Sequence, residues 1–236
     1  MYGFYSYESV AVKKARAANA LLKLKKKNPD IAPVIIEGRQ IAKSWWGKAW
    51  IENLERYADY ANRIDRGKSY VKNGMVLDLQ IRKGSISALV CGSRAKPYEV
   101  SINIDPLPPA SMDKLAKLCG HRIDTIEALI AGKFTKELGD LLSAKGTGLF
   151  PSPKEIHFSC SCPDWANMCK HVASVLYGIG ARLDGEPLLF FTLRNIDSER
   201  FIKKSVAKKT ELMLANAGKN SSRSIDDKDI AGLFGV

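Results

Sequence analysis

Long apolar runs are missing from this sequence of 236 residues. No stretch approaches the roughly 20 consecutive apolar residues that a membrane-spanning helix needs. The first residues, Met1 to Tyr7, also lack the basic and then apolar layout of a secretion signal. We therefore expect a cytoplasmic protein with no membrane partner.

Residues suited to acid–base catalysis are scarce as well. The chain has three histidines, and it contains no G-x-S-x-G motif, no H-E-x-x-H motif and no paired-carboxylate pattern. The segment Gly67-Lys68-Ser69 matches the end of a phosphate-binding loop, but Asn62 stands where the first glycine of that loop is required. The sequence thus predicts neither an enzyme nor a small-molecule substrate.

Cysteine is uncommon, with five residues in all, but three of them lie close together. Cys160, Cys162, Cys169 and His171 follow the pattern C-x-C-x6-C-x-H. Three thiolates and one imidazole are typical of a closed, tetrahedral Zn²⁺ site, and the single histidine favours zinc over an iron–sulfur cluster. We expect one structural zinc ion, with no open position for a reacting water. His157 is a nearby alternative ligand, but it lies outside the pattern and is expected to be a strand residue.

The stretch from Cys160 to His171, with the helical pattern that follows it, resembles the SWIM-type zinc finger. That family has C-x-C, a short variable gap and then C-x-H at the start of a helix, and the likeness covers roughly residues 155–185. The flanking segments Trp45-Trp46-Gly47-Lys48-Ala49-Trp50 and Leu233-Phe234-Gly235 are similar to those of bacterial proteins with this finger. The resemblance implies binding to nucleic acid or protein and association with a Swi/Snf-class helicase. It implies no catalytic activity.

The balance of charge favours polyanionic partners. Lys and Arg number 37 against 25 Asp and Glu, which gives a formal net charge of +12. Cations interleaved with an aromatic residue are typical of surfaces that neutralise phosphates and stack a base. We predict that nucleic acid, expected to be DNA, contacts Arg63, Arg66, Lys68, Tyr70, Lys72, Arg82, Lys83, Arg94, Lys96 and Lys170. The alternative is that lysines at strand edges and turns serve only to prevent aggregation.

Hydrophobic periodicity predicts an α+β fold. An N-terminal antiparallel sheet with helices is followed by a helical bridge, a small C-terminal zinc finger of strand–turn–helix form, and a basic helix with a flexible tail. The corresponding domains are 1–107, 108–150, 151–197 and 198–236.

Within these domains the expected elements are helices over 8–27, 44–62 and 198–217, a strand over 33–37 and an antiparallel meander over 68–105. The pair Asn73-Gly74 is typical of a type I′ hairpin turn inside the meander. Trp46, Trp50 and Leu54 fall on one stripe of the second helix, and we expect this stripe to be core.

The C-terminal end carries a short apolar turn. Ile230, Leu233 and Phe234 follow Asp229 at helical spacing, after a polar stretch. This turn could dock onto the protein itself or onto a partner, and a frayed end fits the pattern equally well. A second functional hypothesis is therefore an adaptor that docks the helicase without contacting nucleic acid directly.

Overall fold

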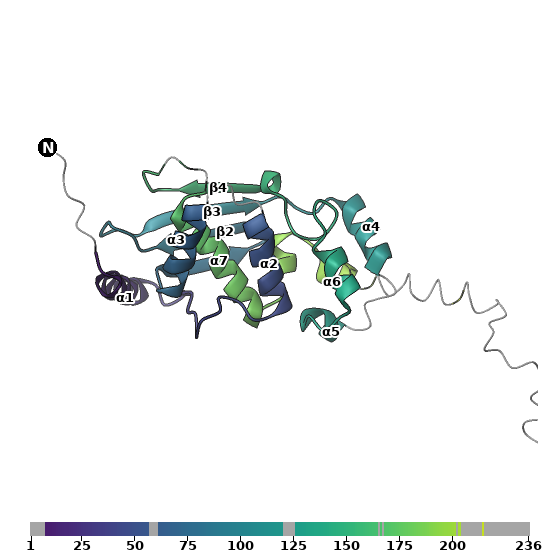
Figure 1. The fold of residues 1–236 in the computed structure, drawn as a ribbon, viewed down its shortest axis with the longest axis horizontal. Coiled ribbons are helices and arrows are strands. Elements are labelled where there is room, and N and C mark those ends of the chain that lie inside the picture. The colour runs from purple at the N-terminus through teal and green to yellow at the C-terminus, as the bar shows by residue number, and fades with distance from the viewer. Residues whose placement is uncertain are drawn as a thin grey trace, which may run out of the picture.

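The structure, a computed structural model, describes residues 8–56, 61–119, 126–164, 166, 168–201, 203 and 214. It is an α+β fold, as the sequence predicts, built around a four-stranded antiparallel sheet (Figure 1). No helix within these ranges is long and apolar enough to cross a membrane.

The strands lie in the sheet in the order in which they occur in the chain. They are β1 (Val76–Arg82), β2 (Ser85–Val90), β3 (Tyr98–Ile104) and β4 (Ile156–Cys160), and each neighbouring pair is antiparallel. In β3, Val100 and Ile102 are buried whereas Glu99 and Ser101 are exposed. This alternation gives the sheet one covered face and one polar face.

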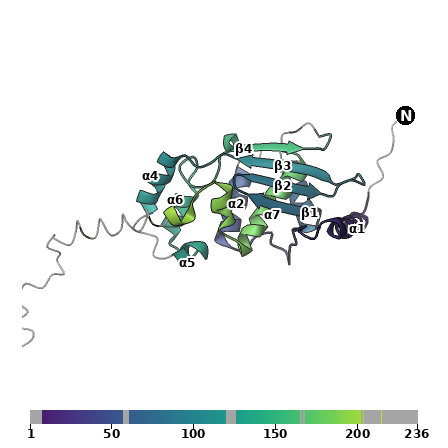
Figure 2. The ribbon, with the colours of Figure 1, turned by 180° about the vertical axis from the view of Figure 1, so that it is seen from behind.

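Helices cover the apolar face. α2 (Trp45–Arg56), α3 (Ala61–Lys72) and α7 (Lys170–Gly185) lie in front of the strands in Figure 1 and behind them in Figure 2. α1 (Val10–Lys27) lies near one end of the sheet, and α4 (Pro109–Cys119), α5 (Ile126–Ile130) and α6 (Lys136–Leu142) lie beyond the other end. The short helix η1 (Pro153–Glu155) leads directly into β4. The short helix α8 (Leu189–Leu193) follows α7.

The predicted tryptophan stripe is confirmed as core. Trp46 is fully buried, and its indole N–H donates to the carbonyl oxygen of Leu129 at 2.9 Å. The indole of Trp50 donates to the carbonyl oxygen of Leu176 in α7 at 2.8 Å. Each buried indole therefore has the one partner that it needs, and the stripe serves packing rather than base stacking.

Residues 61–72 form a helix, which corrects the start of the predicted meander. Ile64 and Val71 of α3 are buried, and Gly67 lies so close to α7 that an added Cβ would be 2.5 Å from the Cβ of Ala173. The alternation of residues at 68, 70 and 72 suggested a strand, but burial follows the helical spacing 64, 67 and 71. The remainder of the meander, from residue 76 to 104, is confirmed as antiparallel strands.

The pair Asn73-Gly74 ends α3 and makes no hairpin turn, so this prediction is wrong. The Asn73 amide donates to the carbonyl oxygen of Ser69, and the Gly74 amide donates to that of Val71, both at 3.1 Å. Gly74 has a φ of +70°. A glycine with positive φ suits a helix end as well as a type I′ turn, so the pair is ambiguous in sequence.

Three other predicted elements have different outcomes. The helix over 8–27 is confirmed as α1, with Ser9 accepting a hydrogen bond from the Val12 amide. The predicted strand over 33–37 is absent. The segment runs irregularly beside β1, where the Val34 amide donates to the carbonyl oxygen of Val76 and the Leu79 amide donates to that of Ala32. The predicted helix over 44–62 is divided into α2 and α3, and residues 57–60 lie outside the described residues.

The sheet joins segments that the sequence analysis assigned to different domains. β4, from the predicted finger, pairs with β3 from the N-terminal part, with Cys160 opposite Val100 and Ile156 opposite Ile104. The helix α7 contacts α2, α3 and the strands. The strand and helix that flank the cysteine motif are therefore integral parts of the main sheet and its helical layer.

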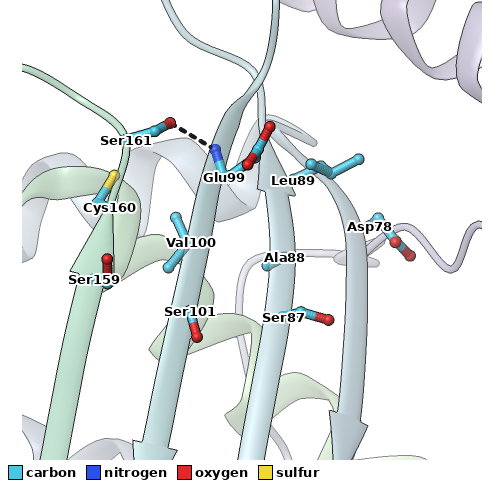
Figure 3. Close-up of a pocket in the computed structure, with 10 residues that line it drawn as sticks. All are labelled: Asp78, Ser87, Ala88, Leu89, Glu99, Val100, Ser101, Ser159, Cys160 and Ser161. Carbon is cyan, nitrogen blue, oxygen red and sulfur yellow. Dashed lines mark hydrogen bonds between the residues drawn. The ribbon is translucent and has the colours of Figure 1, made fainter.

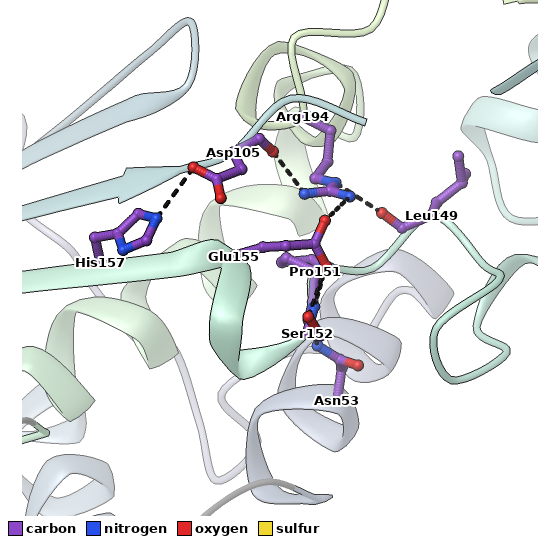
Figure 4. Close-up of polar contacts among 8 residues, drawn as sticks. All are labelled: Asn53, Asp105, Leu149, Pro151, Ser152, Glu155, His157 and Arg194. Carbon is purple, nitrogen blue, oxygen red and sulfur yellow. Dashed lines mark hydrogen bonds and ion pairs between the residues drawn. The ribbon is translucent and has the colours of Figure 1, made fainter. Parts of the chain in front are cut away.

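A buried arginine fastens these segments to one another (Figure 4). Arg194 donates from Nε to the carbonyl oxygen of Leu149, from Nη1 to that of Asp105, and from Nη2 to the carboxylate of Glu155, at 3.0, 2.6 and 2.7 Å. Burial raises the pKa of Glu155, but hydrogen bonds from Ser152 and Arg194 outweigh burial and leave this pKa below its ordinary value. Arg194 thus links the ends of β3, of the helical bridge and of η1.

Candidate metal centre and its surroundings

The four predicted metal ligands converge between β4 and α7. Cys160 is the last residue of β4, Cys162 follows it, Cys169 caps the N-terminus of α7 and His171 lies in the first turn of that helix. One ligand atom from each side chain lies within 4.8 Å of the others. Bonds of about 2.0–2.3 Å would place tetrahedral ligands roughly 3.5 Å apart, so the group is close enough to hold one metal ion after a small inward adjustment.

The start of α7 favours the charged form of one cysteine. Cys169 Sγ accepts a hydrogen bond from the Val172 amide at 3.5 Å, at the helix end where the backbone dipole attracts negative charge. A hydrogen bond from Cys160, with further donors at His171 and Val172, lowers the pKa of Cys169 to about 3. The pKa of Cys160 is raised, because its thiol donates a hydrogen bond to Cys169 and is partly buried. Cys169 thus favours its charged form, and a cation bound beside it would neutralise this charge.

The imidazole of His171 is oriented towards the sulfur atoms. Its Nδ1 lies 3.9 Å from Sγ of both Cys160 and Cys169. Tyr98 stacks on the ring at 4.3 Å between centroids, and Tyr70 approaches it edge-on at 5.5 Å. These ring contacts orient the imidazole so that Nδ1 lies close to all three sulfur atoms.

The opposite nitrogen of His171 faces a glycine. Nε2 is buried and has no hydrogen-bond partner among the described residues. An added Cβ on Gly92 would lie 3.2 Å from this atom and 2.3 Å from the ring of Tyr98. The carbonyl oxygen of Gly92 also accepts a hydrogen bond from Arg16 of α1 at 3.0 Å. Sequence reasoning missed Gly92, Tyr98 and Arg16, because nothing in their spacing connects them with the cysteine motif.

The donor set fits a metal ion better than it fits a network of protons. Two of the four side chains are buried and two are partly buried, and one buried ring nitrogen turns towards three sulfur atoms that are weak hydrogen-bond acceptors. His157 is not part of this group. It lies in β4, with its Nε2 3.1 Å from a carboxylate oxygen of Asp105 (Figure 4), so its predicted place in a strand is confirmed.

Part of the predicted nucleic-acid surface lies around this centre. Arg63 and Arg66 of α3 face the same region as Lys170 of α7: Arg63 forms an ion pair with Asp164, and Lys170 lies over the ring of Tyr70 at 5.6 Å. Burial, and then the charge of Arg66, lowers the pKa of Lys170. These side chains form a basic surface at the end of the sheet where the metal ligands lie.

The loop between β2 and β3 extends this basic surface. Arg94 lies over the ring of Tyr98 at 5.5 Å, and Tyr98 in turn stacks on His171. We call Arg63, Arg66, Tyr70, Arg94 and Lys170 the knuckle surface. Arg66 and Arg94 are exposed, and within the described ranges neither is in an ion pair.

The other predicted contacts are not brought together in this way. Lys68 is 2.8 Å from the carboxylate of Glu55 and Lys96 is 2.9 Å from that of Glu99. Lys72 is the last residue of α3. Arg82 and Lys83 lie at the turn between β1 and β2, at the end of these strands opposite to the candidate metal ligands. Because 68 and 72 are in a helix, the strand-edge explanation does not apply to those two lysines. The predicted docking residues Ile230, Leu233 and Phe234 lie outside the described residues.

The uncovered face of the sheet holds a hollow of about 530 Å³ (Figure 3). Its lining combines serines, apolar side chains, one cysteine and two carboxylates: Asp78, Ser87, Ala88, Leu89, Glu99, Val100, Ser101, Ser159, Cys160 and Ser161. The Ser161 hydroxyl accepts a hydrogen bond from the Glu99 amide at 2.9 Å. With two carboxylates and no cation in its lining, this hollow is unsuited to phosphate and stays outside the knuckle surface.

Comparison with known proteins adds a relative without a described function. The uncharacterized protein Rv2102 of Mycobacterium tuberculosis is 31% identical over 172 residues, which are 72% of this chain and 62% of the relative. The chain thus spans less than two thirds of the length of that relative. No family model matches the chain, and no solved structure matches it.

Proposed function

We propose that the Cys3His group binds one structural Zn²⁺ in a SWIM-type finger, and that the protein is a non-catalytic nucleic-acid-binding protein. The observation that carries the proposal is the convergence of Cys160, Cys162, Cys169 and His171 within 4.8 Å. Three sulfur atoms and one imidazole nitrogen suit Zn²⁺ in a closed tetrahedral site. When bound, Zn²⁺ supplies a fixed link between β4 and α7 and neutralises the thiolates.

The nucleic-acid part of the proposal is supported by the knuckle surface. Arg66 and Arg94 have exposed guanidinium groups that suit phosphate oxygens, which they can approach with two parallel hydrogen bonds. Tyr70 lies edge-on to His171, and Lys170 lies over the ring of Tyr70. The net charge of +12 attracts a polyanion from a distance. On the resemblance to bacterial SWIM proteins, the partner nucleic acid is DNA and the protein is an accessory to a Swi/Snf-class helicase.

The proposal is tested by the salt dependence of DNA binding. Binding of a duplex should weaken steeply between about 50 and 200 mM salt, because each phosphate contact releases counterions. Replacing both exposed arginines, Arg66→Gln with Arg94→Gln, should weaken binding and reduce the slope of log K against log salt by about 1.8. The matched control is Lys114→Gln with Lys117→Gln on α4, which removes the same charge far from the knuckle surface.

Two results would contradict the proposal. One is the absence of duplex binding at low salt with fully metallated protein. The other is an equal loss in the two double variants, which would mean that net charge alone, and not the knuckle surface, attracts the DNA. Metal content is measured separately, so a failure of DNA binding leaves the assignment of zinc to be judged by itself.

A further inference from the structure

The outer edge of β4 carries backbone groups that no described strand uses. The Asp105 amide donates to the Glu155 carbonyl and the Ser161 amide donates to the Glu99 carbonyl, so positions 155, 157, 159 and 161 point their backbone groups towards β3. In an antiparallel pair these directions alternate. The N–H and C=O groups of Phe158 and the C=O group of Ile156 therefore point away from the sheet, whereas the N–H of Ile156 is already used and donates to the carbonyl oxygen of Pro153. Figure 1 shows β4 as the edge strand, with no described element alongside it.

An apolar cavity lies beside this open edge. It measures about 60 Å³ and is lined by Trp50, Asn53, Leu54, Pro153, Ile156, Phe158, Met168 and Leu176. The side-chain amide of Asn53 is already used, since it donates to the carbonyl oxygen of Pro151 at 2.9 Å. Apart from the side-chain carbonyl oxygen of Asn53 and the sulfur of Met168, the lining is hydrocarbon. Phe158 therefore offers its N–H and C=O groups at the edge, Ile156 offers its C=O group, and both place apolar side chains in the adjoining cavity.

We propose that this edge binds an extended peptide segment of another protein, which adds to β4 as a fifth strand and places an aliphatic side chain in the cavity. A row of alternating amide and carbonyl groups is complementary to an extended backbone, and an adjoining pocket selects the side chain. The charge of +12 disfavours a second copy of this chain as the occupant and favours a segment with acidic residues. Lys154, exposed in η1 directly before β4, is placed to contact such an acidic residue.

This inference is independent of the proposed nucleic-acid surface. The edge groups at Ile156 and Phe158 are backbone atoms, and none of the cavity residues belongs to the knuckle surface. Metallated protein can therefore bind a peptide whether or not it binds DNA.

The probe is a fluorescent peptide of about ten residues, with alternating valine and threonine and aspartates at both ends. In an antiparallel addition, the residues opposite Ile156 and Phe158 have their side chains on the helical side of the sheet, so the valines form the backbone hydrogen bonds. N-methylation of the valines should weaken binding to the full metallated chain by about tenfold or more, because two hydrogen bonds are lost. N-methylation of the threonines should leave binding nearly unchanged.

Protein variants test the same edge from the other side. Phe158→Pro removes the outward N–H of that position without removing a bond to β3, and Phe158→Leu removes aromatic packing but keeps the amide. We expect the proline variant to lose about tenfold more affinity than the leucine variant. Because the proline variant can fail to fold, the N-methylated peptides, which use unaltered protein, decide the matter in that case.

Each outcome supports or overturns the inference. A loss confined to one N-methylated peptide supports strand addition, and the identity of that peptide gives the direction of the added strand. Equal binding of both methylated peptides, or no binding of the unmodified peptide at about 1 mM, overturns the inference. A dimer in sedimentation that Phe158→Pro abolishes would place a second copy on the edge and would overturn it as well.

Discussion

At the scale of single residues, the candidate metal centre depends on contacts that hold one imidazole. His171 is held between Tyr98, stacked at 4.3 Å, and Tyr70, edge-on at 5.5 Å. Gly92 makes this arrangement possible, because no Cβ fits between its backbone and the ring of Tyr98. Side chains that orient a ligand have a large effect on metal affinity without touching the ion.

Gly92→Ala should therefore weaken zinc binding by about 10- to 100-fold. The new methyl group would be 2.3 Å from the Tyr98 ring, so Tyr98 has to move and His171 loses its stacking partner. Competition with a chromophoric chelator measures the affinity. Gly185→Ala, where an added Cβ meets nothing within 4 Å, is the control. Equal affinities in the two variants would show that the stacking does not position the ligand.

Low pH should weaken the ion pair between Arg194 and Glu155. The pKa of Glu155 is lowered from its ordinary value of 4.5 in the folded protein, so its stabilising contribution is fully present above that value and is lost as the pH falls through the lowered folded pKa. Glu155→Gln should cost about 1–3 kcal/mol near neutral pH and should remove this part of the acid sensitivity. Urea unfolding of both proteins near neutral pH and at a pH below 4.5 measures the effect. A variant with an unchanged dependence on pH would refute this role of Glu155.

At the scale of elements, the contact between α3 and α7 sets the position of the basic residues. Gly67 permits the two helices to approach, with the position of its absent Cβ 2.5 Å from the Cβ of Ala173. This approach brings Arg63 and Arg66 of α3 near Lys170, the first residue of α7. A helix contact without any charged group thus determines which cations share a surface.

Gly67→Ala should destabilise the protein by about 1–3 kcal/mol, the usual effect of forcing extra atoms into a packed contact. In an unobstructed helix the same change would stabilise by about 0.4–1 kcal/mol. Gly185→Ala at the end of α7, where an added Cβ meets nothing within 4 Å, is the matched control. Thermal unfolding followed by circular dichroism distinguishes them. If both variants were stabilised, α3 and α7 would not be in close contact.

At the scale of the whole molecule, the candidate metal centre belongs to the same core as the sheet. β4 and α7 each supply ligands and each contact β3. Trp50 of α2 donates an indole hydrogen bond to the carbonyl oxygen of Leu176 in α7, so its fluorescence is a probe of this core. If the finger were an isolated unit, loss of the metal would unfold only the finger. Because the candidate site shares its core with the sheet, loss of the metal should lower the stability of the whole described fold.

Removal of zinc with a chelator should accordingly lower the unfolding temperature of the entire protein. The far-ultraviolet circular dichroism and the tryptophan fluorescence should change in one coincident transition, because the sheet and the indoles unfold together. Re-addition of Zn²⁺ should restore the original midpoint. Two separate transitions, with the sheet signal unaffected by the chelator, would show that the motif folds on its own.

Local chemistry was readable from the sequence. The ligand set from Cys160 to His171 follows from the residue types and their spacing, and α1, the strands from residue 76 to 104 and the buried Trp46 and Trp50 follow from periodicity. Asn73-Gly74 was misread because a helix end and a type I′ turn both require positive φ.

Only the tertiary structure decided which distant segments meet. Gly92 and Tyr98 approach His171 across the sheet, and β4 pairs with β3 although more than fifty residues separate them in the chain. Hydrophobic patterns specify which face of an element is buried, and they carry no information about the partner against which that face is buried. The candidate metal ligands are local in sequence and their grouping could be predicted, whereas their supporting contacts and the open edge of β4 depend on the order of strands in the sheet.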